Sequence, residues 1–282
     1  MEWNFCLIDN HSKLTGIKMN LFFNENGQSS SETIIFIHGL GISGWMWNEQ
    51  LEFFNDYHCI IPDLPEHGKS RALNHFTIDD AAESIVELIN EYAHNQRVHL
   101  VGISLGAQVV LQILSKAPEL VDSAFISGAL ISTSPNNTTL LKSLYHTLEV
   151  YQPVKNSDFF IKANMRTYNM PKRFYKEFKK STASIENKNL EEILRENITF
   201  KLPIGLENLE VPVLVMVGEK DYKIIKKSAL AIIEKLPESE SAMACNVGHL
   251  WNLESPKLFN SVLYSWLTER KLPVNGISSI KI

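Results

Sequence analysis

Short apolar runs and amphipathic segments alternate along the first half of the chain. A strand that is covered on both faces reads as a continuous apolar run of roughly four to eight residues, whereas a helix repeats its apolar positions every three or four residues. The helix signal is clearest from Ile78 to Tyr92, where Asp79, Asp80 and Glu83 lie near the start and the positive end of the helix dipole favours acids. We predict antiparallel strands at 3–8 and 16–23, further strands at 33–37, 58–61, 97–101 and 121–127, and helices at 47–54, 78–92 and 105–115.

The alternation stops after Ser127 and resumes near Val211. Beyond that point we predict strands at 211–217 and 239–245 and helices at 223–235 and 254–269. Strands that alternate with helices form a mainly parallel, doubly wound sheet, and its ligands bind at the carboxyl ends of the strands. We therefore predict an α/β core of eight strands, made of residues 1–132 and 206–282. Residues 133–205 show only helical patterns and are predicted to form a helical cap, inserted between two core strands over that edge of the sheet.

Composition narrows the class of protein. The chain has 282 residues, 44% of them hydrophobic and 21% charged, as expected of an ordinary soluble globular protein. Its net charge of −5 provides no basic field that would attract nucleic acid or anionic lipid. The basic residues within 172–180 are interleaved with Phe and Tyr and are interpreted as one solvated helix face. The three cysteines are widely spaced, so disulfides and a metal site are not expected. We find no secretory leader and no apolar stretch of about 20 residues, so we expect a cytoplasmic protein without a membrane span.

The segment Gly102-Ile103-Ser104-Leu105-Gly106 carries the most informative chemistry. It joins the strand predicted at 97–101 to the helix predicted at 105–115. Glycines on both sides of a serine allow a sharp turn in which two chain segments approach too closely for a Cβ atom. A serine at such a strand-to-helix turn is a nucleophile elbow, which holds the hydroxyl out at the carboxyl end of the sheet. The sequence therefore predicts that Ser104 is a nucleophile.

A serine nucleophile needs a base that takes its proton and an acid that orients the base. In folds with this elbow the acid, and then the histidine, follow the serine in the chain. Of the nine histidines, seven precede Ser104 and one lies in the predicted cap, which leaves His249, directly after the last predicted strand. The strand before that one runs into Gly218-Glu219-Lys220-Asp221. Asp221 is preferred to Glu219 as the acid because its loop can turn back toward His249.

Acyl transfer also needs hydrogen-bond donors for the oxyanion. The first expected donor is the backbone N–H of Leu105, directly after the nucleophile. The second is expected from the loop His38-Gly39-Leu40-Gly41, in which Leu40 follows the His-Gly pair. Backbone donors do not depend on the side chain, and leucine at both positions would make the neighbouring pocket apolar. We expect substrate contacts from aromatic residues of the cap and of the catalytic loops, namely Trp45, Tyr145, Tyr168 and Trp251.

Four motifs together resemble those of the α/β-hydrolase superfamily. They are His38-Gly39-Leu40-Gly41, Asp63-Leu64-Pro65-Glu66-His67-Gly68-Lys69-Ser70, Gly102-Ile103-Ser104-Leu105-Gly106, and Gly218-Glu219-Lys220-Asp221 with Gly248-His249. The resemblance spans nearly the whole chain and implies a capped α/β-hydrolase fold and a serine hydrolase of the carboxylesterase type, with no cofactor or metal. In this family the second motif is a structural turn, so His67 is not expected to be catalytic. Glu66 stands where glycine is common, and Ala107 stands where a second glycine is common after the elbow.

Other functions share parts of this pattern. Residues 39–44 spell Gly-x-Gly-x-x-Gly after a predicted strand, and Asp63 follows at about the spacing of the ribose-binding acid in an NAD site. An NAD-dependent oxidoreductase would leave the elbow, the late aspartate and the late histidine unexplained. Two further alternatives keep the fold: a C–C hydrolase or lyase, whose acidic substrates typically need a cationic group, and a small-molecule sensor in signalling with an intact triad. Hydrolysis of a small carboxylic ester with an apolar portion is the predicted activity.

Overall fold

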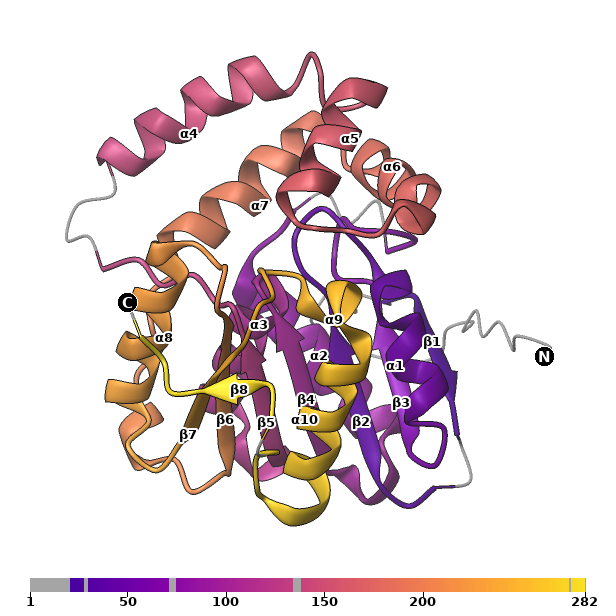
Figure 1. Ribbon diagram of the computed structural model, residues 1–282, viewed down its shortest axis with the longest axis vertical. Helices are drawn as coiled ribbons and strands as arrows, with labels where there is room; N and C mark the ends of the chain where they lie inside the picture. Colours follow the sequence, from indigo (N-terminus) through magenta and orange to yellow (C-terminus); the bar gives the residue numbers. More distant parts are fainter. Residues whose placement is uncertain (1–20, 28–29, 71–74, 134–137, 274, 282) are drawn as a thin grey trace, which may run out of the picture.

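The computed structural model describes residues 21–27, 30–70, 75–133, 138–273 and 275–281. The strand predicted at 3–8 and most of the strand predicted at 16–23 lie outside these residues. Among the described residues, eight strands form one sheet in the order β1-β3-β2-β4-β5-β6-β7-β8 (Figure 1). The strands are β1 (Phe23–Asn26), β2 (Thr33–Ile37), β3 (His58–Pro62), β4 (Val98–Ile103), β5 (Val121–Ser127), β6 (Val213–Gly218), β7 (Glu240–Ala244) and β8 (Ile277–Ser278).

The sheet is mainly parallel, as predicted. Each neighbouring pair from β3 through β2, β4, β5 and β6 to β7 is parallel. The two edge strands are antiparallel, β1 to β3 and β8 to β7. Strand β1 shares only Phe23 with the strand predicted at 16–23. Strand β8 was not predicted, because Ile277 and Ser278 are too few residues to show an alternating pattern.

Helices cover both faces of the sheet. They are α1 (Asn48–Phe53), α2 (Ile78–Tyr92), α3 (Leu105–Lys116), α8 (Lys223–Lys235), α9 (Trp251–Glu254) and α10 (Pro256–Glu269). Successive residues of a strand point to opposite faces, so Ile35 and Ile37 of β2 pack with α2, α3 and α8, whereas Ile34 and Phe36 pack with α1, α9 and α10. Burial on both faces explains why the core strands read as unbroken apolar runs.

Four predicted helices are found at or within a residue of the predicted bounds: α1, α2, α3 and α8. The helix predicted at 254–269 is instead two helices, α9 and α10, which are separated by Ser255 with φ −140° and ψ 68°. Pro256 cannot donate a backbone N–H, so it starts the second helix rather than continuing the first. No helix among the described residues is long and apolar enough to span a bilayer.

Four more helices lie between β5 and β6 in the chain and above the carboxyl ends of the strands (Figure 1). They are α4 (Thr138–Tyr151), α5 (Asp158–Thr167), α6 (Tyr175–Ser184) and α7 (Asn187–Thr199), and we call residues 138–199 the upper helical layer. Glu192 and Glu196 of α7 accept the N–H groups of Phe76 and Ile78, at the start of α2, at 3.3 and 3.1 Å. The bond to Ile78 satisfies a donor that the start of a helix leaves unpaired, and both bonds tie the layer to the core.

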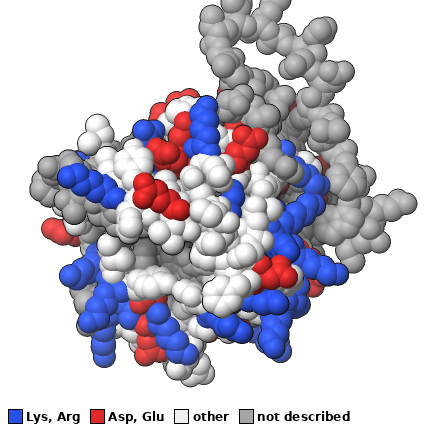
Figure 2. All heavy atoms as spheres, turned by 90° about the horizontal axis from the view of Figure 1, so that it is seen from above, with Lys and Arg blue, Asp and Glu red and all other residues white. Residues whose placement is uncertain are grey.

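The outer side of the upper helical layer is hollowed near its middle when the molecule is viewed from above (Figure 2). Uncharged residues surround the hollow, whereas lysines and arginines lie mainly toward the periphery (Figure 2).

Candidate active site

Ser104 lies in a sharp turn between β4 and α3. Its backbone has φ 59° and ψ −117°, a conformation that costs a non-glycine residue about 1–3 kcal/mol. A Cβ atom on Gly102 would lie 2.5 Å from the carbonyl oxygen of Gly106, and one on Gly106 would lie 2.2 Å from that of Ile37. Both flanking glycines are therefore required by close backbone approach. Ser104 also donates its N–H to the carbonyl of Ser127 at 2.8 Å, which fixes the turn against the end of β5.

The loop after β2 packs directly against the nucleophile elbow. A Cβ atom on Gly39 would touch Cβ of Ser104 at 3.4 Å. His38 holds this loop from beneath: its Nε2 accepts the N–H of Leu64 at 2.9 Å, so its proton is on Nδ1, which donates to the Gly39 carbonyl at 2.8 Å. Complete burial lowers the pKa of His38 to about 4, which keeps the ring neutral near pH 7.

The backbone N–H groups of Leu40 and Leu105 have no acceptor among the described residues, and neither do those of the neighbouring Gly41 and Gly106. Leu105 is the first residue of α3, where a helix leaves its N–H groups unpaired and its dipole favours negative charge. Leu40 follows Gly39 in the loop that touches Ser104. Both donors are thus free to stabilise an anionic oxygen.

Asp221 and His249 form a hydrogen-bonded pair at the ends of β6 and β7. Nδ1 of His249 lies 2.9 Å from Oδ2 of Asp221, and Oδ1 of Asp221 accepts the N–H of Tyr222 at 2.8 Å. A carboxylate only accepts hydrogen bonds, so Nδ1 of His249 is the donor, and in the neutral ring Nε2 carries no proton. The Asp221 side chain is 1% exposed and that of His249 is 11% exposed, so water screens this pair poorly.

Gly128, directly after β5, makes room for the histidine ring. It has φ +66°, and a Cβ atom on it would lie 2.9 Å from Cε1 and 3.1 Å from Nδ1 of His249. The neighbouring Ser127 carbonyl accepts the N–H of Ser104. The end of β5 therefore contacts both the elbow and the ring of His249. The sequence analysis missed Gly128, because a Ser-Gly pair at a strand end does not show which distant side chain it faces.

Two other carboxylates fix the loop that carries His249. Glu219 accepts the N–H of Asn246 at 2.7 Å, and Glu254 accepts the N–H of Gly248 at 2.7 Å. Glu219 is thus used by the backbone rather than by the histidine ring. Asp122, near the start of β5, is paired with Arg97 at 2.7 Å and takes no part in these contacts.

The four predicted substrate-binding aromatics lie in different surroundings. The ring of Tyr168 lies 6.1 Å from that of His249, and burial raises its pKa to about 12, so it stays a neutral phenol. Trp45 donates Nε1–H to Ser181 Oγ of α6 at 2.8 Å, so it joins the core to the upper helical layer. Tyr145 is 46% exposed on α4, with no polar contact to the predicted site residues.

Trp251 does not lie where a substrate contact was expected. It is wholly buried between Phe125 and Phe259, and its Nε1–H donates to Ser127 Oγ at 2.9 Å. It therefore supports β5 from within the core and does not line the entrance to the site. Its nearness to His249 in sequence was misleading because the short helix α9 turns this side chain inward.

The motif that resembles a dinucleotide site is accounted for by its own internal contacts. Asp63 accepts the N–H of Gly44 at 2.7 Å and that of Lys69 at 2.8 Å, so the acid and the last glycine of the motif bind each other. His67 donates its Nδ1–H to the Pro65 carbonyl, 2.9 Å away, and complete burial lowers its pKa to about 3. The segment 63–70 is thus a hydrogen-bonded turn, and its carboxylate is not directed at a ligand.

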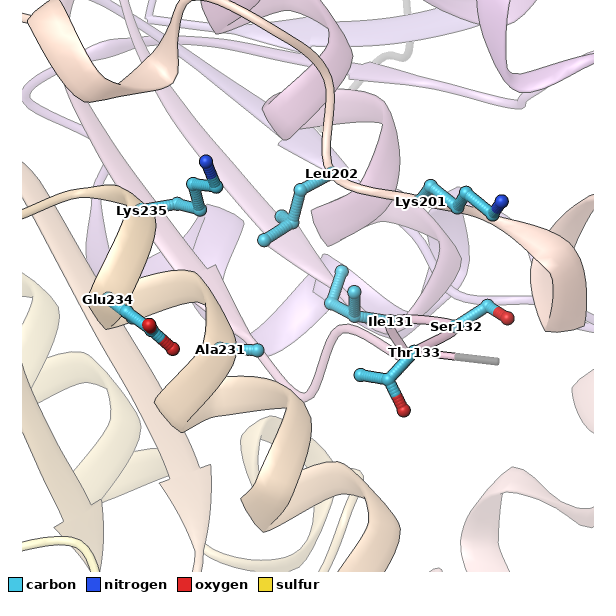
Figure 3. Close-up of a pocket in the computed structure, with 8 residues that line it drawn as sticks. All are labelled: Ile131, Ser132, Thr133, Lys201, Leu202, Ala231, Glu234 and Lys235. Atoms are coloured by element: carbon cyan, nitrogen blue, oxygen red, sulfur yellow. The ribbon is translucent and has the colours of Figure 1, made fainter. Parts of the chain in front are cut away.

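A separate cavity of about 390 Å³ lies where the chain enters and leaves the upper helical layer (Figure 3). The ammonium groups of Lys201 and Lys235 point in different directions in it, and the side chains of Ile131 and Leu202 lie between them (Figure 3). Its polar groups do not converge on one point, and none of the residues that line it belongs to the site around Ser104.

Comparisons with known proteins define the class of protein. Residues 34–262 match the model of the alpha/beta hydrolase family, so the chain belongs to this family. It is 26% identical over 281 residues to an AB hydrolase superfamily protein of Gibberella zeae, which covers 94% of this chain and 92% of that protein. It is 27% identical over 258 residues to Lipase 1 of Psychrobacter immobilis, with 83% of this chain and 76% of that protein covered.

Solved structures show the same fold. A thermophilic esterase from Thermogutta terrifontis superposes with a TM-score of 0.72 at 19% identity, over 88% of this chain and 92% of that one. The eight-stranded sheet, the elbow and the family match agree, so the chain is a hydrolase of the alpha/beta family.

Proposed function

We propose that the protein hydrolyses small carboxylic esters through an acyl-enzyme, with Ser104 as nucleophile, His249 as base and Asp221 as the acid that orients it. The observation that carries this proposal is the hydrogen bond of 2.9 Å between Asp221 and His249. The His249 ring lies against Gly128, and the residue before Gly128, Ser127, accepts the N–H of Ser104. Similarity to a lipase and an esterase supports ester hydrolysis as the reaction class.

In the first half-reaction, Nε2 of His249 takes the proton of the Ser104 hydroxyl as the oxygen attacks the ester carbonyl. The carbonyl oxygen becomes an anion, which the N–H groups of Leu40 and Leu105 stabilise. The imidazolium that forms is stabilised by Asp221, which remains ionised. His249 then gives its proton to the departing alcohol, and the acyl group stays on Ser104.

In the second half-reaction, the same histidine takes a proton from water, and the resulting hydroxide attacks the acyl-enzyme. The tetrahedral intermediate uses the same two amides. Its collapse releases the carboxylic acid, and the proton returns from His249 to Ser104 Oγ. Both half-reactions thus use one base and one pair of oxyanion donors.

We further propose that residues 133–205 act as a cap domain and that the substrate has an apolar portion. Tyr168 beside His249 and the partly buried Leu40 support an apolar surround, whereas the side chain of Leu105 is wholly buried in the core. Trp45 is a candidate substrate contact because it lies where the core joins α6. Tyr145 is exposed on α4 and is a candidate contact only at the outer rim of the site.

Turnover of p-nitrophenyl butyrate by purified protein tests the proposal. The Ser104→Ala variant is expected to lose at least about 1,000-fold in kcat while it unfolds at the same temperature as the wild type. Ser261→Ala, at an exposed serine of α10, is the matched control and should keep full activity. Activity that survives in Ser104→Ala would contradict the proposal. A single burst with no further turnover would favour the sensor alternative instead.

A further inference from the structure

Glu254 joins the loop of His249 to the upper helical layer. Its Oε2 accepts the N–H of Gly248, the residue before His249, at 2.7 Å. Its Oε1 accepts the side-chain N–H of Asn169, just after α5, at 3.2 Å. One carboxylate therefore holds the backbone next to the proposed base and a residue of the overlying layer at the same time.

The core fixes Glu254 from one side. It is the last residue of α9, whose Trp251 and Leu253 are buried with 0% and 1% exposure. Pro256 prevents α9 from continuing, so Glu254 stays at the helix end, where its carboxylate can turn back to Gly248. A Cβ atom on Gly248 would lie 3.4 Å from Oε2 of Glu254, which shows how closely this contact is packed.

The upper helical layer presents Asn169 from the other side. Asn169 has φ +49°, the left-handed conformation that ends a helix, and its N–H donates to the Arg166 carbonyl at 3.1 Å. Met170 is buried in the same core cluster as Trp251. Tyr168, on the other side of Asn169, is the residue whose ring lies near His249. The 168–170 segment is thus anchored on both sides of its contact with Glu254.

From these contacts we infer that Glu254 is a positioning residue that couples the placement of the upper helical layer to that of His249. When the 168–170 segment is seated, Asn169 holds the carboxylate in the rotamer that binds Gly248, and Tyr168 lies against His249. When the segment lifts, Glu254 loses one of its two partners and the His249 loop becomes less ordered. The inference rests on the proposed function, because it assigns to His249 the role of base.

Glu219 provides a matched comparison. It accepts the N–H of Asn246 at 2.7 Å and so holds the same loop, but the described residues give it no contact with the upper helical layer. If Glu254 only stiffened the loop, the effect of replacing Asn169 would be the same in a Glu254 variant as in a Glu219 variant. If Glu254 transmits the position of the layer, only Glu254 is coupled to Asn169.

A double-mutant cycle separates these cases, with kcat and KM for p-nitrophenyl butyrate as the readout. Asn169→Ala is expected to raise KM about two- to fivefold with a smaller fall in kcat, since an exposed hydrogen bond is a modest contact. Glu254→Ala is expected to lower kcat about tenfold and also to raise KM. In the Glu254→Ala background, Asn169→Ala should leave kcat and KM almost unchanged. In the Glu219→Ala background, it should change kcat and KM as much as it does in the wild type. Glu254→Gln, whose amide oxygen can still accept from Gly248 while the Asn169 amide rotates, should recover most of the kcat.

Hydrogen exchange without substrate provides a readout that does not depend on the reaction. Asn169→Ala should speed amide exchange in residues 246–250, and Glu254→Ala should speed it in residues 165–170, whereas Glu219→Ala should affect only the first segment. Unchanged exchange in residues 246–250 of Asn169→Ala, or kinetic effects of Asn169→Ala and Glu254→Ala that simply multiply, would overturn the inference. Loss of the proposed function would appear differently, as wild-type protein without ester turnover but with coupled exchange.

Discussion

Gly128 and His249 are in contact across the end of the sheet: a Cβ atom on Gly128 would lie 2.9 Å from Cε1 of the histidine ring. Gly128 also has φ +66°, so a substitution there would strain the backbone as well as displace the ring. Because Ser127 anchors the N–H of Ser104, the same strand end contacts both the proposed nucleophile and the proposed base.

Gly128→Ala should therefore damage catalysis more than stability. Displacement of the His249 ring by a few tenths of an ångström or more is expected to lower kcat about 10- to 100-fold. Gly205→Ala is the matched control, since Gly205 has φ +86° but no atom within 4 Å of an added Cβ. Both variants should lose a similar 1–2 kcal/mol, roughly, in the free energy of unfolding, and only Gly128→Ala should lose activity. Equal activity of the two variants would mean that the Gly128 contact does not position the base.

Asp221→Asn should leave the fold intact and nearly abolish turnover. The amide can donate to Nδ1 of His249, which would move the ring proton to Nε2 and remove the base. By analogy with the serine-protease triad, kcat should fall about 10⁴-fold. Asp122→Asn is the control, because it breaks only the surface pair with Arg97 and should keep full activity. A fall of less than tenfold in Asp221→Asn would argue for a different acid, and Glu219 would be the next candidate.

The two buried histidines His38 and His67 should make the protein sensitive to acid. Burial lowers their pKa values to about 4 and about 3, below the value of about 6.5 in an unfolded chain. The native state therefore binds fewer protons than the unfolded state, so these groups favour folding above pH 6.5 and the advantage is lost as the pH falls toward 4. For His38 the loss amounts to about 3 kcal/mol.

Urea unfolding between pH 4 and 7 measures this dependence. His67→Leu removes one of the two titrations and should flatten the fall in the free energy of unfolding. His146→Ala, at a side chain that is 83% exposed, should leave the slope unchanged. An identical slope in wild type and His67→Leu would show that His67 is not buried as a neutral ring.

Trp251→Phe separates a structural from a substrate-binding role. It removes the donor to Ser127 Oγ and leaves a buried hydroxyl unpaired, which is expected to cost about 1–3 kcal/mol in the free energy of unfolding. KM should change less than twofold, because Trp251 has no exposed surface. Trp45→Phe is the comparison, since this residue joins the core to α6, and there KM should rise with little loss of stability. The reverse pattern in the two variants would restore Trp251 as a substrate contact.

The places of the candidate site residues in the fold could be predicted because the sequence motifs impose local geometry. The elbow glycines are required by backbone approach within a few residues, and buried parallel strands show as apolar runs, so Ser104, Asp221 and His249 could be placed at strand ends. The break after Ser127 marked the helices of the upper layer in the same way.

What could not be predicted depends on contacts between distant segments. Gly128 is required by a ring 121 positions later in the chain, and no local pattern shows that. The direction of Trp251 depends on the turn before α10, and the two partners of Glu254 come from two different layers. Strand β8 forms only because β7 offers an edge to two residues that carry no pattern of their own.

Covalent labelling with a fluorophosphonate, followed by peptide mass spectrometry, tests the central claim most directly. Such a reagent phosphonylates a serine whose hydroxyl is activated by a neighbouring base. We expect one adduct per chain, on Ser104, with loss of ester turnover in step with labelling and no adduct in the His249→Ala variant. An adduct on a different serine, or full turnover by protein that remains unlabelled, would contradict the assignment of Ser104 as the nucleophile.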